Sequence, residues 1–167
     1  MISTTYARRM AAYNQWMNDR LYGCCATLSD EERKRDAGAF FKSIHGTLNH
    51  LLLADRVWLG RFGQEPFAVQ SLDQELYADF AQLRAERAAM DASIVEWAAA
   101  LSDADLAGEL AYVGIVNPQR RRCPYGLAVA HFFNHQTHHR GQVTTLLAQR
   151  GIDPGVTDVL WLPEAPA

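Results

Sequence analysis

Hydrophobic and polar positions follow helical spacing over the first part of the chain. Residues 4–28 are rich in good helix formers and contain no proline, which predicts a first long helix. Residues 29–32 read Ser-Asp-Glu-Glu, a capping-box pattern that opens a short helical turn. Residues 40–61 are apolar almost all round. A helix of that kind belongs in the interior of a bundle.

The pattern changes after residue 61. Residues 73–101 alternate apolar positions with arginine and glutamate, as expected of an outer bundle helix with Ser71 as its N-cap. Residues 110–123 are β-prone on either side of Asn117-Pro118, which predicts a short hairpin or an extended crossover. A last helix is expected from Pro124, as its first residue, to about Arg150.

Four long helical segments and one crossover predict an all-α four-helix bundle, with a short β-like hairpin before the last helix. The chain has 167 residues, enough for one sizeable core, so we expect residues 1–167 to form a single domain. The tail, residues 152–167, carries apolar residues around Trp161. We expect it to pack back on the bundle.

Charge and composition exclude several classes of function. The net charge of −3 gives no electrostatic case for nucleic-acid binding, and the arginines at 120–122 are interpreted as a solvated turn. No apolar run reaches the length of a membrane span, and the N-terminus lacks a signal pattern. Cys24, Cys25 and Cys123 form no C-x-x-C motif. We therefore expect a cytoplasmic protein with reduced thiols, at least one of them buried.

Residues 130–145, AHFFNHQTHHRGQVTT, contain four of the six histidines. His131, His135 and His139 recur every four residues, so they lie on one side of a helix. Two imidazoles one turn apart can bind the same metal ion. For any single histidine a solvated or hydrogen-bonded role is the favoured interpretation, whereas for the three in register both interpretations remain open.

The helical face favours one pair among these histidines. At about 100° per residue, His139 lies closest to the apolar stripe and His135 lies next to it. His131 and His138 lie further round, towards solvent. Metal sites in helical bundles are built in the core from facing helices, which favours His135 and His139 as the ligand pair. The stripe consists of Val129, Phe132, Phe133, Val143 and Leu147, with Leu146 at its edge.

Polar residues also interrupt the first two helices. His45, His50 and Asp55 fall in the apolar segment 40–61, and a buried histidine needs a partner. That segment has no clear polar face, so the pattern does not choose between His45 and His50. In the first helix Asn14 and Asn18 lie four residues apart, and an exposed polar face is the simplest interpretation.

Three motifs carry a resemblance to a known family that extends from the first helix to the turn at residues 151–153. The motifs are Tyr13-Asn14-x-Trp16-x-Asn18, Asn49-His50-Leu51-Leu52 followed by Asp55-Arg56 and Trp58, and Asn134-His135 followed by His138-His139-Arg140-Gly141-Gln142. In these motifs the chain resembles the DinB/YfiT-like metalloenzymes, the damage-inducible four-helix-bundle family.

The resemblance implies a four-helix bundle with a long crossover, often dimeric. It also implies one divalent metal ion bound by three histidines. Carried over residue by residue, these are His50, His135 and His139. The family motif thus selects His50 over His45 and the same pair on the last helix that the helical face favours. Relatives include thiol-dependent isomerases and S-transferases and metal-dependent hydrolases, and several have no known activity.

Three neutral imidazoles leave an open coordination position, as in catalytic zinc sites, and Zn, Ni, Fe or Mn would suit the site. The leading hypothesis is a thiol-dependent S-transferase in which the metal holds the sulfur of a small thiol for attack on an electrophile. A metal-dependent hydrolase and a non-catalytic metal-binding protein are the alternatives. The expected partners are therefore a small thiol, an electrophilic substrate and a second copy of the chain, in a homodimer.

The sequence assigns no catalytic side chain. Asp55 lies five residues from His50 and on a different face of the helix, so it is no obvious general base. If Asn14 and Asn18 face the cavity of the bundle, they could donate hydrogen bonds to the substrate.

Overall fold

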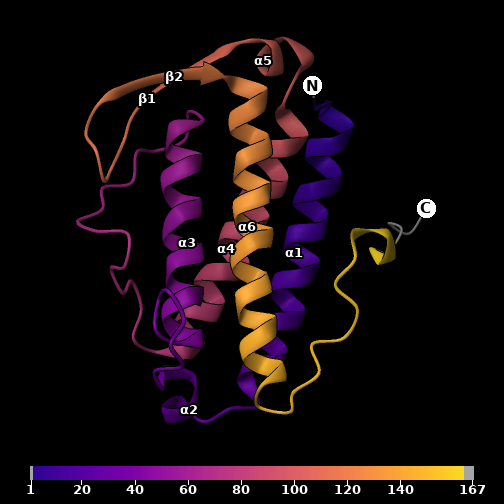
Figure 1. Cartoon of the computed structure of the whole chain (residues 1–167). Coiled ribbons are helices and arrows are strands. Elements are labelled where there is room, and N and C mark those ends of the chain that lie inside the picture. Colours follow the sequence, from indigo (N-terminus) through magenta and orange to yellow (C-terminus); the bar gives the residue numbers. More distant parts are fainter. Residues whose placement is uncertain (1, 164–167) are drawn as a thin grey trace.

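Four long helices lie side by side in the computed structural model, which describes residues 2–163 (Figure 1). Both α1 and α3 pack against α4 and α6, so the four helices enclose a common core. The predicted all-α bundle with a hairpin before its last helix is confirmed. The long helices are α1 (Thr4–Ala26), α3 (Ile44–Arg61), α4 (Phe80–Ala100) and α6 (Tyr125–Ala148).

Side-chain caps fix where the first helices begin. The Ser3 side chain accepts a hydrogen bond from the backbone N–H of Tyr6 and starts α1. The capping box expected at residues 29–32 is present, because Ser29 and Glu32 bond reciprocally at the start of α2 (Asp30–Lys34).

The second long helix, α3, begins at Ile44, four residues later than predicted. Ser43 is its N-cap, and Lys42 has a positive φ of 66°, which ends any helix before it. A Cβ on Gly46 would clash with the carbonyl oxygen of Phe41. Glycine at this position therefore lets the preceding turn close against the helix.

The expectation of a third helix over residues 73–101 with Ser71 as N-cap is wrong at its start. Helix α4 begins at Phe80, and the Asp79 side chain caps it. The side-chain oxygen of Asn49 accepts hydrogen bonds from the backbone N–H groups of Leu76 and Tyr77, both at 2.9 Å. Because those N–H groups are tied to α3, residues 62–79 form an irregular connection that runs along this helix.

The expected hairpin is present between α5 (Asp103–Ala107) and α6. Strands β1 (Glu109–Val113) and β2 (Arg120–Pro124) pair antiparallel across one end of the bundle (Figure 1). Pro124 is the N-cap of α6, so the helix begins one residue later than predicted.

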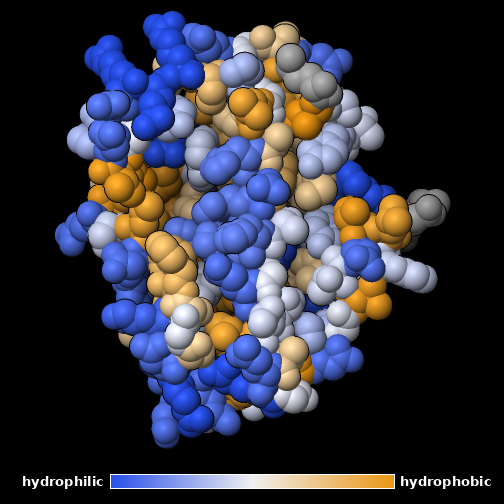
Figure 2. Space-filling model, viewed as in Figure 1, coloured by the Kyte–Doolittle hydropathy of each residue, from blue (hydrophilic) through white to orange (hydrophobic). Residues whose placement is uncertain are grey.

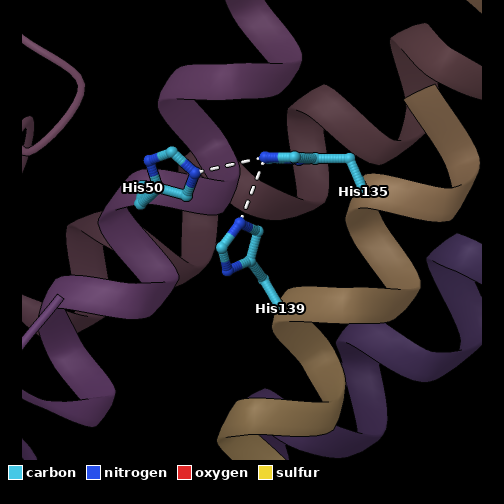
Figure 3. A group of neighbouring side chains, drawn as sticks. All are labelled: His50, His135 and His139. Atoms are coloured by element: carbon cyan, nitrogen blue, oxygen red, sulfur yellow. Dashed lines mark hydrogen bonds between the residues drawn. The ribbon is translucent and has the colours of Figure 1, made fainter. Parts of the chain in front are cut away.

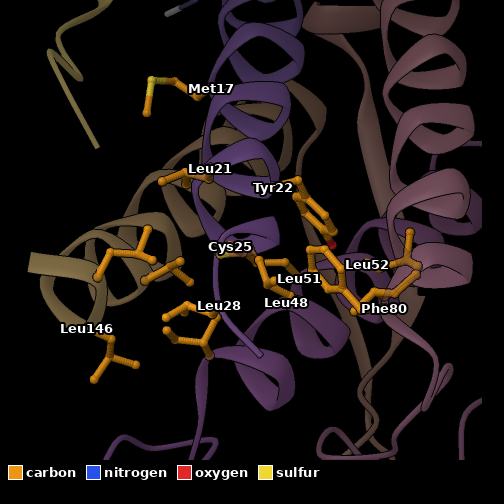
Figure 4. Close-up of a cluster of buried hydrophobic side chains, with 14 of the residues drawn as sticks. Met17, Leu21, Tyr22, Cys25, Leu28, Leu48, Leu51, Leu52, Phe80 and Leu146 are labelled. Atoms are coloured by element: carbon orange, nitrogen blue, oxygen red, sulfur yellow. The ribbon is translucent and has the colours of Figure 1, made fainter. Parts of the chain in front are cut away.

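The core consists of two clusters of buried side chains. One surrounds Tyr22 and Phe80, whose rings stack at 5.8 Å (Figure 4). The other lies towards the hairpin and contains Phe62 and Trp97, stacked at 4.8 Å. From the tail, Leu162 joins the first cluster, whereas Trp161 is 66% exposed. The expected return of the tail to the bundle is therefore made through Leu162, and residues 164–167 lie outside the described part.

The three cysteines are free thiols, and Cys25 is buried in the first cluster, as expected of at least one of them. Within residues 2–163, no helix combines the length and apolar character needed to cross a membrane.

Candidate metal centre

Three imidazoles converge between α3 and α6 (Figure 3). The Nε2 atom of His135 lies 3.3 Å from Nε2 of His50 and 3.1 Å from Nε2 of His139. One nitrogen from each ring lies within 4.8 Å of the other two. The structure thus brings together the three histidines predicted as ligands, and the group could hold a metal ion.

The helices place these rings by spacing and packing. His135 and His139 are one turn apart on the side of α6 that faces α3. His50 is buried on α3, and its ring stacks on that of Phe41 with centroids 3.7 Å apart. The turn before α3, closed at Gly46, therefore fixes the orientation of one of the three imidazoles.

The outer nitrogens of two rings are held by hydrogen-bond acceptors. His50 Nδ1 donates to the carbonyl oxygen of Leu72 at 2.8 Å, and His139 Nδ1 donates to Oε1 of Gln142 at 2.8 Å. These bonds assign the proton of each neutral ring to Nδ1 and leave a lone pair on Nε2. Histidine ligands of metals are oriented by the same kind of outer hydrogen bond.

This arrangement directs three electron-rich nitrogens at one point. His135 Nε2 lies between the other two and can donate a proton to only one of them. A cation at the centre would satisfy all three lone pairs. Ligand nitrogens about 2.05 Å from a tetrahedral metal are roughly 3.3 Å apart, close to the two separations observed. The donor set therefore fits a metal ion with its fourth position open.

Burial keeps these imidazoles neutral. Together with the smaller effect of neighbouring histidines, it lowers the pKa of His50 to about 4 and that of His135 to about 3. Burial also lowers the pKa of His139. At neutral pH all three rings are in the form that binds metals.

The other histidines lie outside this group. His138 and His131 are exposed, as the helical face predicted. His45 is buried, but its Nε2 donates to the carbonyl oxygen of Tyr77 at 2.9 Å and so binds the connection at 62–79. The hydrophobic pattern left open whether His45 or His50 joins the group. In the fold His50 lies with His135 and His139, whereas His45 bonds to Tyr77.

A cavity of about 480 Å³ opens beside the three-histidine group. Helix α3, the connection, the hairpin and α6 all contribute to its wall. Two arginines line it, and among the described lining residues there is neither a carboxylate nor a cysteine. The lining residues are His50, Ala54, Val57, Trp58, Arg61, Leu72, Tyr112, Gly114, Ile115, Val116, Asn117, Arg121, His131 and His135.

No functional role was expected from the sequence for three residues that lie around the histidines or the cavity. Leu72 contributes a backbone oxygen, which carries no side-chain signal. Gln142 belongs to the last-helix motif, and its position three residues after His139 is the spacing that brings helix side chains together. Arg121 belongs to the basic turn interpreted as solvated, although its side chain also lines the cavity.

The interpretation of Asn14 and Asn18 as an exposed polar face is wrong. Both are buried, and both donate through Nδ2 to Oδ1 of Asp91, at 3.0 and 2.9 Å. Arg140 also donates to the side-chain oxygen of Asn14. The amide donors suggested for substrate binding are thus used by Asp91 on α4. Sequence spacing showed that the two asparagines share a side, but not that a buried carboxylate faces them.

Asp55 takes part in the same buried network. Its Oδ2 accepts a hydrogen bond from Arg87 Nη1 at 2.5 Å, and Arg87 Nη2 lies 2.9 Å from Asp91. The Asp55 carboxylate thus faces α4, consistent with the expectation that it does not serve the histidine group as a base.

Comparisons with known proteins agree with this architecture. The model of the DinB family matches residues 1–166. Protein DinB of Bacillus subtilis (strain 168) is 26% identical over 168 residues, covering 92% of this chain and 91% of the relative. A crystal structure of a DinB-like protein from Bacillus cereus ATCC 10987 has a TM-score of 0.62 at 22% identity, covering 84% of this chain and 90% of that one. That likeness supports the fold.

Proposed function

The chain belongs to the DinB family, and on that premise we propose that it is a divalent-metal-dependent S-transferase that conjugates a small thiol to an electrophile. One observation carries the proposal: three imidazole Nε2 atoms converge beside a cavity that His50 and His135 line and that is large enough for a small molecule. A metal held by His50, His135 and His139 would supply Lewis acidity and lower the pKa of a sulfur or oxygen nucleophile.

The residues around the cavity favour a thiol as that nucleophile. A free thiol has a pKa near 8.5, whereas water has a pKa near 15.7, so a thiol needs much less help to ionise. Water attack is usually assisted by a general base, and the described lining residues include no carboxylate. The carboxylate of Asp55, which follows the lining residue Ala54 in the sequence, is engaged by Arg87.

The thiol would have to come from solution. Cys25 is buried in the core, and Cys24 contacts the backbone of Asp153 near the tail. Cys123 packs against the cluster of side chains near the hairpin. Since none of the three lines the cavity, a protein thiol is not placed to act as the nucleophile.

The roles of the chain's own groups follow from their geometry. The hydrogen bonds from His50 to Leu72 and from His139 to Gln142 keep the Nε2 lone pairs directed inward. The apolar side chains of Ala54, Val57 and Trp58 line the cavity and limit the access of water to a bound sulfur.

The proposal is tested by a conjugation assay with a panel of biological thiols and the general electrophile 1-chloro-2,4-dinitrobenzene. We expect metal-loaded protein to consume thiol faster than chelated protein, and the His139→Ala variant to behave like the chelated protein. Equal rates for loaded and chelated protein with every thiol would contradict the proposal. Turnover of ester or amide substrates without thiol would then identify a hydrolase, and stoichiometric metal without either activity a metal-binding protein.

A further inference from the structure

The cavity beside the three-histidine group is positively charged. Arg61, the last residue of α3, and Arg121, in the middle of β2, both line it. The lining residues among the described part of the chain include no aspartate or glutamate. Two guanidinium groups without an acidic neighbour in the same wall favour an anionic ligand.

The guanidinium of Arg61 is held in place without a carboxylate. It lies 4.6 Å from the ring centroid of Trp58 and 4.5 Å from that of Tyr112, and its Nη2 donates to the carbonyl oxygen of Val113 at 3.2 Å. The ion pairs found within residues 2–163 use other arginines. Aromatic stacking thus fixes the position of a charge that no described carboxylate neutralises.

Arg121 reaches the cavity because of its position in the hairpin. It pairs with Tyr112, and successive side chains of a strand point to opposite faces. Arg122, on the other face, forms an ion pair with Glu109 at 2.9 Å. A Cβ on Gly114 would lie 3.8 Å from Arg121 Nε, so the hairpin loop lies directly beside this side chain.

Two arginines and two histidines line the same cavity. His50 and His135 line the cavity that Arg61 and Arg121 line, and its volume of about 480 Å³ is in the range of small-molecule sites. We propose that the thiol bound here is a thiol acid, with a carboxylate held by Arg61 and Arg121 and its sulfur directed at the histidines. This inference rests on the proposed function and names its substrate class.

Arginine is suited to this task because its planar group binds carboxylates through two parallel hydrogen bonds. A carboxylate on the electrophile would satisfy the same arginines. The two sources are separated by measuring binding of thiols in the absence of any electrophile.

The test compares two thiols that differ only at the end remote from sulfur. Isothermal titration calorimetry with zinc-loaded protein measures the Kd of 3-mercaptopropionate and of 2-mercaptoethanol. We expect the carboxylate thiol to bind about tenfold more tightly or better, the value of one charge-assisted hydrogen bond. The Arg121→Gln variant should lose most of that preference.

The matched control is Arg120→Gln, which removes an equal charge from the neighbouring position of the same strand, where the side chain does not line the cavity. It should keep the preference of the wild type. Equal affinities for the two thiols in the wild type would overturn the proposal. Equal loss in the Arg120→Gln and Arg121→Gln variants would also overturn it, because the effect would then be one of overall charge.

A second arm needs neither metal nor catalysis. Chelated protein is titrated with succinate and with succinamide, and we expect only succinate to bind, more weakly in Arg121→Gln. If this holds while metal removal leaves the conjugation rates unchanged, the arginine site stands and the S-transferase proposal fails. If succinate binds but the two thiols do not differ, the carboxylate belongs to the electrophile and the thiol-acid proposal is overturned.

Discussion

Gln142 accepts a hydrogen bond from Nδ1 of His139 at 2.8 Å, one turn along α6. The bond fixes the ring of His139 so that its Nε2 faces His135 at 3.1 Å. Gln142 therefore orients one histidine of the candidate metal centre from outside the three-histidine group. Residues in this position orient ligands and raise their basicity.

The first prediction follows from that bond. Gln142→Leu removes the acceptor at similar size and should weaken zinc binding by about 10- to 100-fold. Gln142→Glu, which offers a carboxylate to the same Nδ1, should keep or strengthen binding. Competition with a chromogenic zinc chelator measures both affinities. Unchanged affinity in Gln142→Leu would show that His139 needs no support from this residue.

The second prediction concerns the ligands themselves. His135→Ala or His139→Ala should abolish stoichiometric metal, because two imidazoles cannot hold the ion as three do. His131→Ala is the control, since this exposed histidine lies on the same helix and its ring centroid is 5.9 Å from that of His135. Elemental analysis of desalted protein gives the stoichiometry. Complete loss of metal in the His131 variant would contradict the assignment.

The sequence predicted part of this centre. The four-residue spacing and the apolar stripe selected His135 and His139, because both depend only on helical periodicity. The choice between His45 and His50 required tertiary information. Both are buried on α3, but they bond to different carbonyl oxygens of the connection. His45 donates to Tyr77, and His50 donates to Leu72. Only the family motif could select His50 before the fold was known.

The errors in the predicted elements have a similar origin. Residues 73–79 have an acceptable helical pattern, but their backbone N–H groups at Leu76 and Tyr77 bond to Asn49 instead. Local helix propensity does not take account of a hydrogen bond to Asn49, which lies nearly thirty positions away in the sequence. For the same reason, the four-residue spacing of Asn14 and Asn18 could not predict that both would hydrogen-bond to the buried carboxylate of Asp91.

The third prediction concerns that buried network. Arg87→Met should lower the free energy of unfolding by about 3–5 kcal/mol, because Asp55 and Asp91 would lose their shared cation in the core. Arg84→Met is the matched control on the same helix. Its guanidinium is about half exposed and lies 3.8 Å from Asp19, so the change should stay within about 0.5 kcal/mol. Urea unfolding followed by circular dichroism measures both, and similar losses would disprove the role of Arg87.

The fourth prediction concerns the ionisation of the buried Cys25 thiol. Burial raises the pKa of the Cys25 thiol to about 12, so at pH 8 roughly one molecule in ten thousand carries the thiolate. Iodoacetamide should therefore alkylate native Cys25 extremely slowly at pH 8. A variant that retains only Cys25 is compared by mass spectrometry with one that retains only the half-buried Cys24. Equal native rates would contradict the burial of Cys25.

The same shift has a consequence for stability. The pKa of Cys25 in the folded chain lies above that of a free thiol, so its contribution to stability is fully present at pH 8 and is lost as the pH rises towards 12. Urea midpoints between pH 8 and pH 10.5 should fall less in Cys25→Ala than in the wild type. A larger fall of the urea midpoint in the variant would contradict a stabilising effect of the protonated Cys25 thiol.

The last prediction concerns assembly. Apolar side chains stand out at the right edge of the molecule, over the C-terminal tail (Figure 2). Leu160 is 88% exposed and Trp161 66%, next to the buried Leu162 that fastens the tail to the core. Apolar surface of this kind, presented on an anchored segment, is typical of an interface. We propose that the tail packs against a second copy of the chain in a homodimer.

Light scattering should therefore report twice the 18.7 kDa mass of the chain at micromolar concentrations. Leu160→Asp should shift the equilibrium to the monomer, because a charge would be buried in an apolar contact. Leu127→Asp is the control, since Leu127 is equally apolar and 60% exposed but lies at the start of α6 and not on the tail. An 18.7 kDa particle in the wild type, or dissociation by the Leu127 variant alone, would contradict an interface at the tail.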